Sequence, residues 1–215
     1  MQDERAQRRQ SLRDDAVNLP NMLTFGRIIA IPLVLWLMWQ DTRESNFWAM
    51  WVYAAAALTD FFDGYLARKM GLTSLLGKFL DPLADKLIVL ATLTLMVELD
   101  RVPAWAVIVI ASRELAVTAL RALAIGEGVV IAASRGGKDK AALQMVAVLA
   151  LILHDTYYMD FGLFAGAISL NSIGLVLLYL SVFFTVTSAG EYVALLVDAV
   201  QAKDRRMAEG ADAED

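Results

Sequence analysis

The sequence predicts an all-α membrane protein with six transmembrane helices and both chain termini in the cytoplasm. Three observations lead to this prediction. Hydrophobic residues make up 58% of the 215 residues, which is more than the core of a domain this small can bury. They are gathered in long apolar stretches, and Lys and Arg lie mainly in alternate connections between these stretches. A chain of this length is expected to form one domain.

Each of the six apolar stretches is close to the roughly 20 residues that a helix needs to cross a bilayer. The stretches span residues 23–40, 47–67, 79–98, 103–124, 141–159 and 166–190. We expect residues 19–200 to form the six-helix domain. Residues 1–18 carry both charge signs without the apolar run of a signal peptide, which predicts a cytoplasmic arm or an interfacial helix. Residues 201–215 have the composition of a disordered tail.

The basic residues predict the orientation in the membrane, because cytoplasmic loops are enriched in Lys and Arg. With the N-terminus inside, the external turns hold only Arg43 and Arg101, and the remaining basic connections are cytoplasmic. The tryptophans lie near the predicted outer ends of the stretches, as in an interfacial aromatic belt; they are Trp36, Trp39, Trp48, Trp51 and Trp105. We therefore expect a multi-pass protein of the inner, cytoplasmic membrane.

The composition limits the chemistry that this chain can perform. It contains no cysteine, which excludes disulfides and thiol catalysis. His154 is the single histidine, so a zinc site with several histidines is excluded. We expect His154 to lie on the outer side, with a structural or incidental role. Catalysis must then depend on carboxylates, Arg, Lys or hydroxyl groups. The net charge of −5 comes partly from the acidic C-terminal tail and identifies no partner; we expect no nucleic-acid partner.

Four aspartates flank the short basic connection between the second and third stretches. Asp60 and Asp63 lie near the end of the second stretch, and Asp81 and Asp85 lie near the start of the third. Residues three or four apart share one face of a helix. Because one helix enters the cytoplasmic interface and the next one leaves it, the two pairs are expected at similar depth. The four carboxylates are therefore expected to converge near the cytoplasmic face.

Convergence of these carboxylates predicts a metal site. An Asp at the centre of a spanning helix costs roughly 2.5–3.5 kcal/mol, and like charges repel each other. Divalent cations in a water-filled cavity are the simplest compensation, and oxygen ligands suit Mg²⁺, or alternatively Mn²⁺, rather than zinc. Two such ions would clamp a diphosphate. The alternative is a carboxylate–Arg network that only orders the helices, but ionisable groups inside a membrane are functional by default.

Small residues beside the aspartates favour a bulky ligand. Gly64 and Ala67 remove side chains next to the carboxylates, which lets a nucleotide approach the helix backbone. A glycine inside a helix lowers helix stability by about 1 kcal/mol relative to alanine. We therefore expect Gly64 to have a role that compensates for this loss. Arg68 is placed to pair with a phosphate, and Gly77 lies one turn before Asp81 on the same face.

The pattern of these residues resembles the signature of the CDP-alcohol phosphotransferases. In this chain it is Asp60-x2-Asp63-Gly64-x2-Ala67-Arg68-x8-Gly77-x3-Asp81-x3-Asp85. The resemblance implies a homodimeric six-helix fold, a CDP-activated lipid as substrate and CMP as leaving group. It implies two metal ions held by the four aspartates, with Asp85 also acting as general base. CDP-lipid contacts are implied for Asp60, Gly64, Ala67, Arg68 and Gly77.

Outside the signature, residues from about 18 to 194 are most similar to the phosphatidylglycerophosphate synthases of that family. The similarity rests on residues 18–27, 112–115 and 137–140, although Ala141 stands where that subfamily usually has Thr. It implies transfer of the phosphatidyl group of CDP-diacylglycerol to sn-glycerol 3-phosphate in membrane lipid synthesis. By the same analogy Asn21 and Thr24 contact the cytidine, with capping of a helix start by Asn21 as the alternative.

Glycerol 3-phosphate brings a dianion, which requires a second basic cluster. Arg113 and Arg121 are eight residues apart on one face of the fourth stretch, and Lys138 and Lys140 lie before the fifth. Guanidinium groups bind phosphate in a bidentate manner, whereas Lys supplies a point charge. Two alternatives remain at this stage: Arg113 is neutralised by Glu114 or by an acid of a neighbouring helix, and the two lysines are ordinary cytoplasmic loop residues.

Two other functions remain as alternatives. The first is the same chemistry with another acceptor, which is inositol phosphate, serine or phosphatidylglycerol. The second is a cation transporter or channel whose aspartates coordinate a permeating ion. Clustering of the acids at one membrane face argues against a transport path, and Gly64, Ala67 and Arg68 would have no purpose in one.

Overall fold

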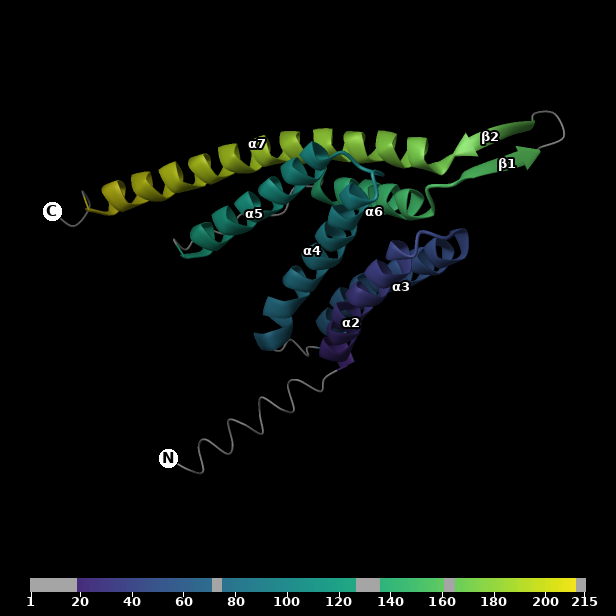
Figure 1. Cartoon of the computed structure of the whole chain (residues 1–215). Helices are drawn as coiled ribbons and strands as arrows, with labels where there is room; N and C mark the ends of the chain where they lie inside the picture. The colour runs from purple at the N-terminus through teal and green to yellow at the C-terminus, as the bar shows by residue number, and fades with distance from the viewer. Residues whose placement is uncertain (1–18, 71–74, 127–135, 161–164, 212–215) are drawn as a thin grey trace, which may run out of the picture. The chain divides into compact units, whose positions relative to one another are not determined.

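In a computed structural model of the chain, the structure describes residues 19–70, 75–126, 136–160 and 165–211. These residues form six helices and one antiparallel sheet of two strands (Figure 1). The helices are α2 (Leu19–Trp39), α3 (Arg43–Met70), α4 (Leu75–Glu98), α5 (Ala104–Gly126), α6 (Gly136–Leu153) and α7 (Leu170–Ala211). Strands β1 (Thr156–Asp160) and β2 (Ala165–Ser169) pair from Thr156 with Ser169 to Asp160 with Ala165. The prediction of a mostly helical chain is confirmed.

Two of the described helices are long and apolar enough to cross a membrane. The corresponding segments are Met22–Trp39 in α2 and Leu170–Asp198 in α7, and α6 contains a shorter apolar segment, Ala142–Leu153. Other helices carry charges along their length; α5, for example, has Arg113, Glu114 and Arg121. The number of six spans therefore stays a prediction, as does the cytoplasmic location of both termini.

The chain divides into two compact units. The first unit contains α2, α3, α4, the end of α6, the two strands and the start of α7. The second unit contains α5, the first part of α6 and most of α7. The predicted aspartate site belongs to the first unit, and the residues predicted to bind the phosphate of glycerol 3-phosphate belong to the second.

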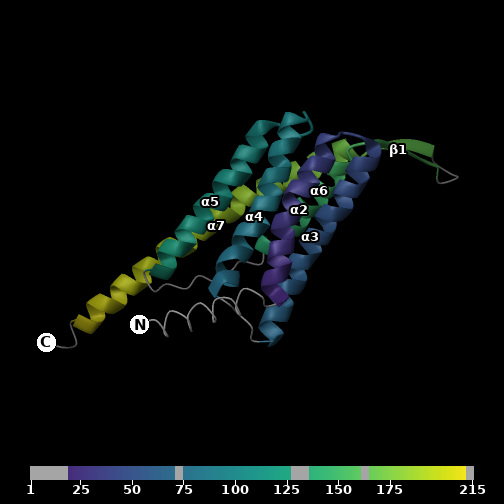
Figure 2. The same cartoon turned by 60° about the horizontal axis from the view of Figure 1, so that its bottom comes forward.

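In the first unit, α2 packs against both α3 and α4 (Figure 2). Buried side chains recur every three or four residues along each helix, which is the period of one helix face. They include Thr24, Arg27, Val34 and Met38 of α2, Ala49, Tyr53 and Ala56 of α3, and Ala84, Ile88, Thr92 and Met96 of α4. Helices α3 and α4 run in opposite directions, so the end of α3, the start of α4 and the start of α2 lie at one end of this unit (Figures 1 and 2).

Three helices of the first unit end beside a residue in the left-handed conformation. These residues are Asp41, Asp100 and His154, with φ angles of 48°, 54° and 33°. At the end of α4, the amides of Asp100 and Arg101 donate to carbonyl groups of the last turn at 3.1 and 2.9 Å. A left-handed residue stops a helix because it redirects the chain and satisfies the last carbonyls.

The structure corrects the limits of the last two apolar stretches. A helix was expected up to residue 159, but α6 ends at Leu153 because His154 takes the left-handed conformation. The next residues form β1, whose Thr156, Tyr157 and Tyr158 are β-branched or aromatic residues that favour strands. The sixth stretch was expected from residue 166, where β2 lies instead, and α7 begins at Leu170. Apolar composition alone does not separate strands from helices.

The tail predicted as disordered from residue 201 is helical up to Ala211. This segment is rich in Ala, Lys, Arg, Met and Glu, which are good helix formers. Extending an existing helix also avoids the unfavourable nucleation step. Residues 212–215 and the predicted arm at residues 1–18 lie outside the described residues.

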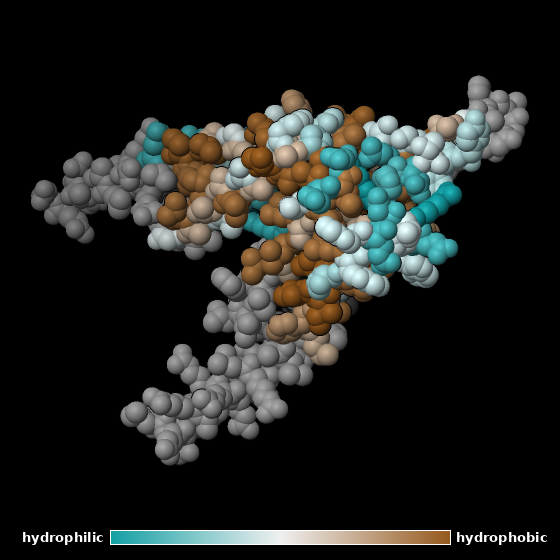
Figure 3. Space-filling model, viewed as in Figure 1, coloured by the Kyte–Doolittle hydropathy of each residue, from teal (hydrophilic) through white to brown (hydrophobic). Residues whose placement is uncertain are grey.

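Large apolar side chains lie on the outside of the helices. Figure 3 shows this apolar surface in brown, whereas hydrophilic surface in teal gathers between the start of α3 and the start of β1. Trp36, Trp39, Trp48 and Trp51 flank the turn between α2 and α3, and between 54% and 65% of each residue is exposed. This turn lies at the opposite end of α3 from Asp60 and Asp63.

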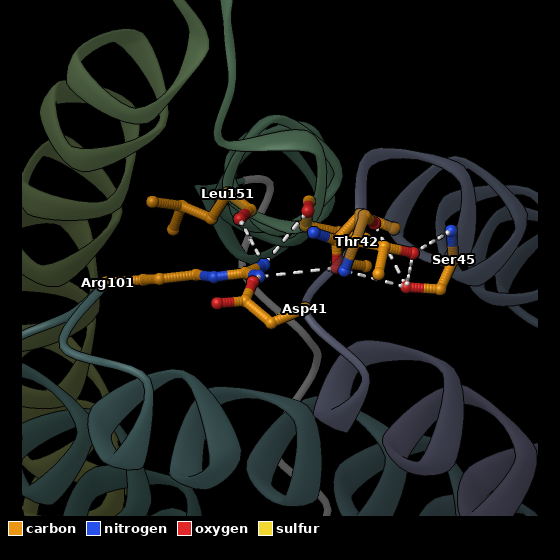
Figure 4. A network of polar contacts seen from close by, with 7 residues as sticks. Asp41, Thr42, Ser45, Arg101 and Leu151 are labelled. Carbon is orange, nitrogen blue, oxygen red and sulfur yellow. Dashed lines mark hydrogen bonds and ion pairs between the residues drawn. The ribbon is translucent and has the colours of Figure 1, made fainter.

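A buried arginine joins three segments at the tryptophan end of the first unit (Figure 4). Arg101, which is 4% exposed, donates through Nη1 to the carbonyl oxygens of Leu151 at 3.3 Å and Ile152 at 2.9 Å. Its Nη2 donates to Oδ1 of Asn46 at 3.2 Å and to the Asp41 carboxylate. Arg101 therefore connects the α2–α3 turn, the α4–α5 connection and the end of α6. We call Arg101 with these four partners the Arg101 cluster.

Two further contacts order the same end of the unit. The hydroxyls and amides of Thr42 and Ser45 bond reciprocally at 3.1 and 3.2 Å, which caps the start of α3. Arg43 lies 3.5 Å from the Asp155 carboxylate and 4.7 Å from the Tyr157 ring centroid. Both arginines that the sequence placed in external turns thus pair with acidic side chains.

Candidate functional site

The four aspartates lie on the two predicted helices. Asp60 and Asp63 are in α3, and Asp81 and Asp85 are in α4. With a rise of about 1.5 Å per residue, Asp63 lies about 10 Å before the end of α3 and Asp81 about 9 Å after the start of α4. Asp60 and Asp85 both lie about 15 Å from these ends. The two pairs therefore occupy matching levels along antiparallel helices.

The aspartates of α3 continue the spacing of the buried residues that precede them in that helix. Ala49, Tyr53 and Ala56 are buried at a spacing of four and three residues. Asp60 and Asp63 follow at the same spacing, which places them on the same face of α3. This face packs against α2 in the described part of the helix, where an α2 side chain bonds to the Ala56 carbonyl.

The aspartates of α4 lie on or next to its buried face. Asp81 precedes Ala84 by three residues and Ile88 by seven, and both of these side chains are buried. The Asp85 side chain is exposed. Asp85 precedes the buried Ile88 by three residues, which places it next to the same face. The side chains of Asp60, Asp63 and Asp81 lie outside the described residues, so convergence of all four carboxylates stays a prediction.

Helix α2 brings two buried polar residues toward the aspartate end. Thr24 and Arg27 are 1% and 2% exposed, and Asn21, whose side chain is not described, precedes Thr24 by three residues on the same face. Nε of Arg27 donates to the carbonyl oxygen of Ala56 at 3.3 Å, one helical turn before Asp60. No role was predicted for Arg27, although an arginine inside an apolar stretch is itself a functional signal.

The other signature residues take the predicted helical positions. Gly64, Ala67 and Arg68 lie in the last turns of α3, and Gly77 lies in the first turn of α4. Their side-chain surroundings lie outside the described residues, and the CDP-lipid contacts assigned to them remain predictions.

In the second unit, Arg113 contacts both its neighbour in α5 and a residue of α7. Nη1 lies 2.8 Å from Oε1 of Glu114, and Nη2 donates to Oγ of Ser188 at 2.9 Å. The expected alternative, an ion pair of Arg113 with Glu114, is therefore present. Within the described part of the chain, Nε of Arg113 has no hydrogen-bond partner.

Arg121 also faces α7. Its guanidinium carbon lies 6.0 Å from the ring centroid of Tyr192, and the residue is exposed. Because Arg113 and Arg121 both contact α7, they lie on one side of α5, as their spacing predicted. Lys138 and Lys140 lie in the first turns of α6, and their side chains are outside the described residues.

Sequence reasoning missed Tyr53, Ser188 and Tyr192. Tyr53 precedes Asp60 by seven residues. Helix periodicity therefore could have predicted that it lies on the same face as the aspartates. Ser188 and Tyr192 gave no such signal, because their contacts with α5 join residues far apart in the sequence.

Comparison with known proteins identifies the family of this chain. A family model described as CDP-alcohol phosphatidyltransferase matches residues 17–187. A Bacillus subtilis (strain 168) protein named CDP-diacylglycerol–glycerol-3-phosphate 3-phosphatidyltransferase is 43% identical over 81% of this chain and 93% of its own length. Proteins with the same name from Rickettsia typhi and Haemophilus influenzae are each 34% identical, over 81% and 86% of this chain and 94% and 98% of their own lengths. This chain belongs to the CDP-alcohol phosphatidyltransferase family.

Proposed function

We propose that this protein transfers the phosphatidyl group of CDP-diacylglycerol to sn-glycerol 3-phosphate, giving phosphatidylglycerophosphate and CMP. The observation that carries the proposal is the placement of the two aspartate pairs at matching levels of α3 and α4, in a chain whose named relatives share this activity. The three relatives are similar over most of their own length, which favours the same acceptor as well as the same chemistry.

The residues at this end of the first unit fit a site for divalent cations. All four aspartates supply hard oxygen ligands, and the described Asp85 carboxylate is exposed rather than enclosed by apolar side chains. Asp60, Asp63, Asp81 and Asp85 would hold two Mg²⁺ ions. When bound, these ions would neutralise the diphosphate of the CDP-lipid and the charge that develops on the departing CMP.

The protein groups then perform binding and proton transfer. Asp85 accepts the proton of the glycerol hydroxyl as that oxygen forms a bond to the lipid-side phosphorus of CDP-diacylglycerol. The bond from this phosphorus to the bridging oxygen of the CMP phosphate breaks, and CMP leaves with the bonding electrons. Asn21 and Thr24 bind the cytidine, and Arg68 pairs with a phosphate. Gly64, Ala67 and Gly77 leave room for the nucleotide beside the helices.

The second unit supplies the acceptor site. Arg113 and Arg121, together with Lys138 and Lys140, bind the phosphate of glycerol 3-phosphate. A guanidinium group presents paired donors that match two phosphate oxygens. Glu114 neutralises part of the charge of Arg113, but Arg121 has no acidic partner among the ion pairs of the described residues.

We further propose that the protein is a homodimer of the inner membrane with six spans per chain and both termini in the cytoplasm. Its apolar outer surface and its long apolar helices support insertion into lipid. Four exposed tryptophans lie at one end of the first unit, where they suit the outer interface. The aspartates lie toward the other end, which would face the cytoplasm.

An acceptor panel tests the proposed reaction. Purified protein with CDP-diacylglycerol and Mg²⁺ is given glycerol 3-phosphate, inositol phosphate, serine or phosphatidylglycerol, and CMP release is measured. We expect release with glycerol 3-phosphate, and ³²P-labelled acceptor should enter the lipid fraction. A lipid product from inositol phosphate but not from glycerol 3-phosphate would overturn the acceptor assignment. Cation flux into liposomes without any CDP-lipid affinity would favour a transporter.

The base assignment is tested by Asp85→Asn. Losing a general base lowers the rate by about 10²- to 10⁴-fold. The same variant in a thermal-unfolding assay in detergent should keep its melting temperature, because the Asp85 side chain is exposed. Wild-type turnover by purified Asp85→Asn enzyme would rule Asp85 out as the base.

A further inference from the structure

A stripe of hydroxyl side chains runs along the buried face of α7 in the second unit. Its members are Ser181, Thr185, Ser188 and Tyr192, which follow one another at spacings of four, three and four residues. Ser181 and Thr185 are fully buried and Tyr192 is 9% exposed. Such a spacing keeps all four on one helix face. We call these four residues the hydroxyl stripe.

The hydroxyl stripe faces the two arginines of α5. Ser188 accepts a hydrogen bond from Nη2 of Arg113 at 2.9 Å, and its own hydroxyl donates to the carbonyl oxygen of Thr185 at 3.1 Å. Four residues further along α7, the Tyr192 ring lies beside the Arg121 guanidinium. The stripe and the arginines therefore form one polar seam between two otherwise apolar helices.

Several hydrogen-bonding groups of this seam are unsatisfied in the described part of the chain. They are the hydroxyl groups of Thr185 and Tyr192 and Nε of Arg113. A buried polar group without a partner is unfavourable and usually marks a bound ligand, ion or water. All three groups can donate a hydrogen bond, and they lie on α7 and on α5, the helix that carries Arg113 and Arg121, which suits an anion with several acceptor oxygens.

We propose that Ser188 and Tyr192 complete the site for the acceptor's phosphate group, an inference that rests on the proposed function. Tyr192 donates its hydroxyl hydrogen to a phosphate oxygen, and its ring holds the guanidinium of Arg121 by a cation–π contact. Ser188 is a positioning residue that fixes Nη2 of Arg113, while Glu114 holds Nη1. Nε of Arg113 is then left to bind phosphate.

This arrangement selects a phosphomonoester over an uncharged alcohol. A tyrosine hydroxyl and a guanidinium Nε donate hydrogen bonds, and a phosphomonoester supplies several negatively charged oxygens to accept them. An uncharged acceptor, such as glycerol, would leave these donors without a negatively charged oxygen to bind. Sites built to hydrogen-bond one group discriminate strongly against ligands that lack it. The hydroxyl stripe therefore acts as a specificity determinant for the acceptor.

Steady-state kinetics of Tyr192→Phe tests this proposal with the full-length enzyme in detergent. The change removes one hydroxyl and keeps the ring beside Arg121. We expect the KM for glycerol 3-phosphate to rise about tenfold or more, as for loss of a hydrogen bond to a charged group. The KM for CDP-diacylglycerol should stay within about twofold of the wild-type value. Ser188→Ala should give the same pattern with a smaller rise.

Matched controls separate this role from a structural one. Tyr179→Phe makes the same change at an exposed α7 tyrosine that stacks on Trp105 at 5.5 Å, and it should leave both KM values unchanged. Thr187→Ala removes an exposed hydroxyl next to Ser188 and serves as the second control. Melting temperatures of all four variants report on folding.

The kinetic results distinguish the proposed phosphate site from a purely structural role of Tyr192. An unchanged KM for glycerol 3-phosphate in Tyr192→Phe, or an equal rise in both KM values, would overturn the proposal. If the wild-type enzyme used inositol phosphate instead, the proposed acceptor would be wrong, but a selective rise in the KM for inositol phosphate in Tyr192→Phe would still support a phosphate site. Turnover of unphosphorylated alcohols alone would refute both the proposed acceptor and the phosphate site.

Discussion

Each unit contains an arginine that is largely buried, Arg101 in the first and Arg113 in the second. The hydrogen-bond partners of the two guanidinium groups differ. Arg101 uses Nη1 for two carbonyl oxygens and Nη2 for two side-chain oxygens, so its guanidinium bonds to four acceptor groups of the protein. Arg113 has one partner on each Nη, and its Nε is unpartnered in the described part of the chain. Both side chains carry the same charge in an apolar setting.

The difference indicates a structural role for the first arginine and a binding role for the second. A guanidinium that bonds to acceptors in separate segments ties these segments together. A guanidinium with a spare donor, beside unsatisfied hydroxyls, has capacity for an anion. Substitution at the two positions should therefore affect different properties of the protein: stability at Arg101 and substrate binding at Arg113.

Arg101→Ala has the largest expected effect on stability. It leaves Asn46 and the α6 carbonyls without their buried donor, and each buried polar group that loses its partner costs about 1–3 kcal/mol. We expect a clearly lower melting temperature in detergent, with both KM values of the folded fraction unchanged. Arg43→Ala is the control, because this arginine is exposed and its pair with Asp155 is worth about 1 kcal/mol or less. Equal losses in both variants would contradict a structural role of the Arg101 cluster.

Arg113→Lys should change binding and leave folding nearly intact. Lysine keeps the positive charge beside Glu114 but lacks the planar fork of donors. We expect kcat/KM for glycerol 3-phosphate to fall by about 10- to 100-fold, equivalent to roughly 1.4–2.8 kcal/mol. The measurement is initial-rate kinetics with either substrate varied, and Arg43→Lys provides the matched control. A lower melting temperature without a kinetic change would place Arg113 with Arg101 as a structural residue.

Much of this architecture was predictable from the sequence, because helix periodicity and apolar length act locally. The positions of α2 to α5, the matching levels of Asp63 and Asp81, and the common side of Arg113 and Arg121 all follow from residue spacing. The turn at His154 was not predictable in this way. It depends on a left-handed residue and on Arg101, 50 residues away from Leu151, taking the last carbonyls of α6. The apolar composition of the segment around His154 favoured the prediction of a continuous helix.

The contacts that distinguish the two arginines were likewise beyond sequence reasoning. The pair of Arg113 with Glu114 was foreseen as an alternative because the residues are adjacent. Its bond to Ser188 joins positions 75 residues apart, and no spacing rule connects them. Arg101 was assigned only to an external turn, since nothing local indicates that Asp41 and Asn46 meet it.

The pH dependence of stability provides the smallest effect. Partial burial by itself would raise the pKa of Asp41, but the hydrogen bond and charge of Arg101, together with Asn46, hold this pKa below its ordinary value of 3.8. A lowered folded-state pKa means that the stabilisation is present above pH 3.8 and is lost as the pH falls through the folded value. The effect is modest because about half of the Asp41 side chain is exposed, where solvent screens the charge.

Melting temperatures measured in detergent from about pH 5 down to about pH 3 would detect this contribution, because this range spans the ordinary carboxyl pKa. Asp41→Asn should melt at a lower temperature than the wild type near pH 5, and the gap should narrow as the pH falls. A gap that is constant across this range would show that the Asp41 charge does not contribute to the Arg101 cluster.

A double-mutant cycle on Asp63 and Asp81 tests most directly whether the two helices share bound ions. The measurement is Mg²⁺-dependent affinity for CDP-diacylglycerol in wild type, Asp63→Asn, Asp81→Asn and the double variant. Because ligands of a common metal site act as a unit, we predict that each single change removes most of the Mg²⁺-dependent affinity and that the second change adds little. Independent, additive losses, or affinity that does not depend on Mg²⁺, would contradict a shared metal site.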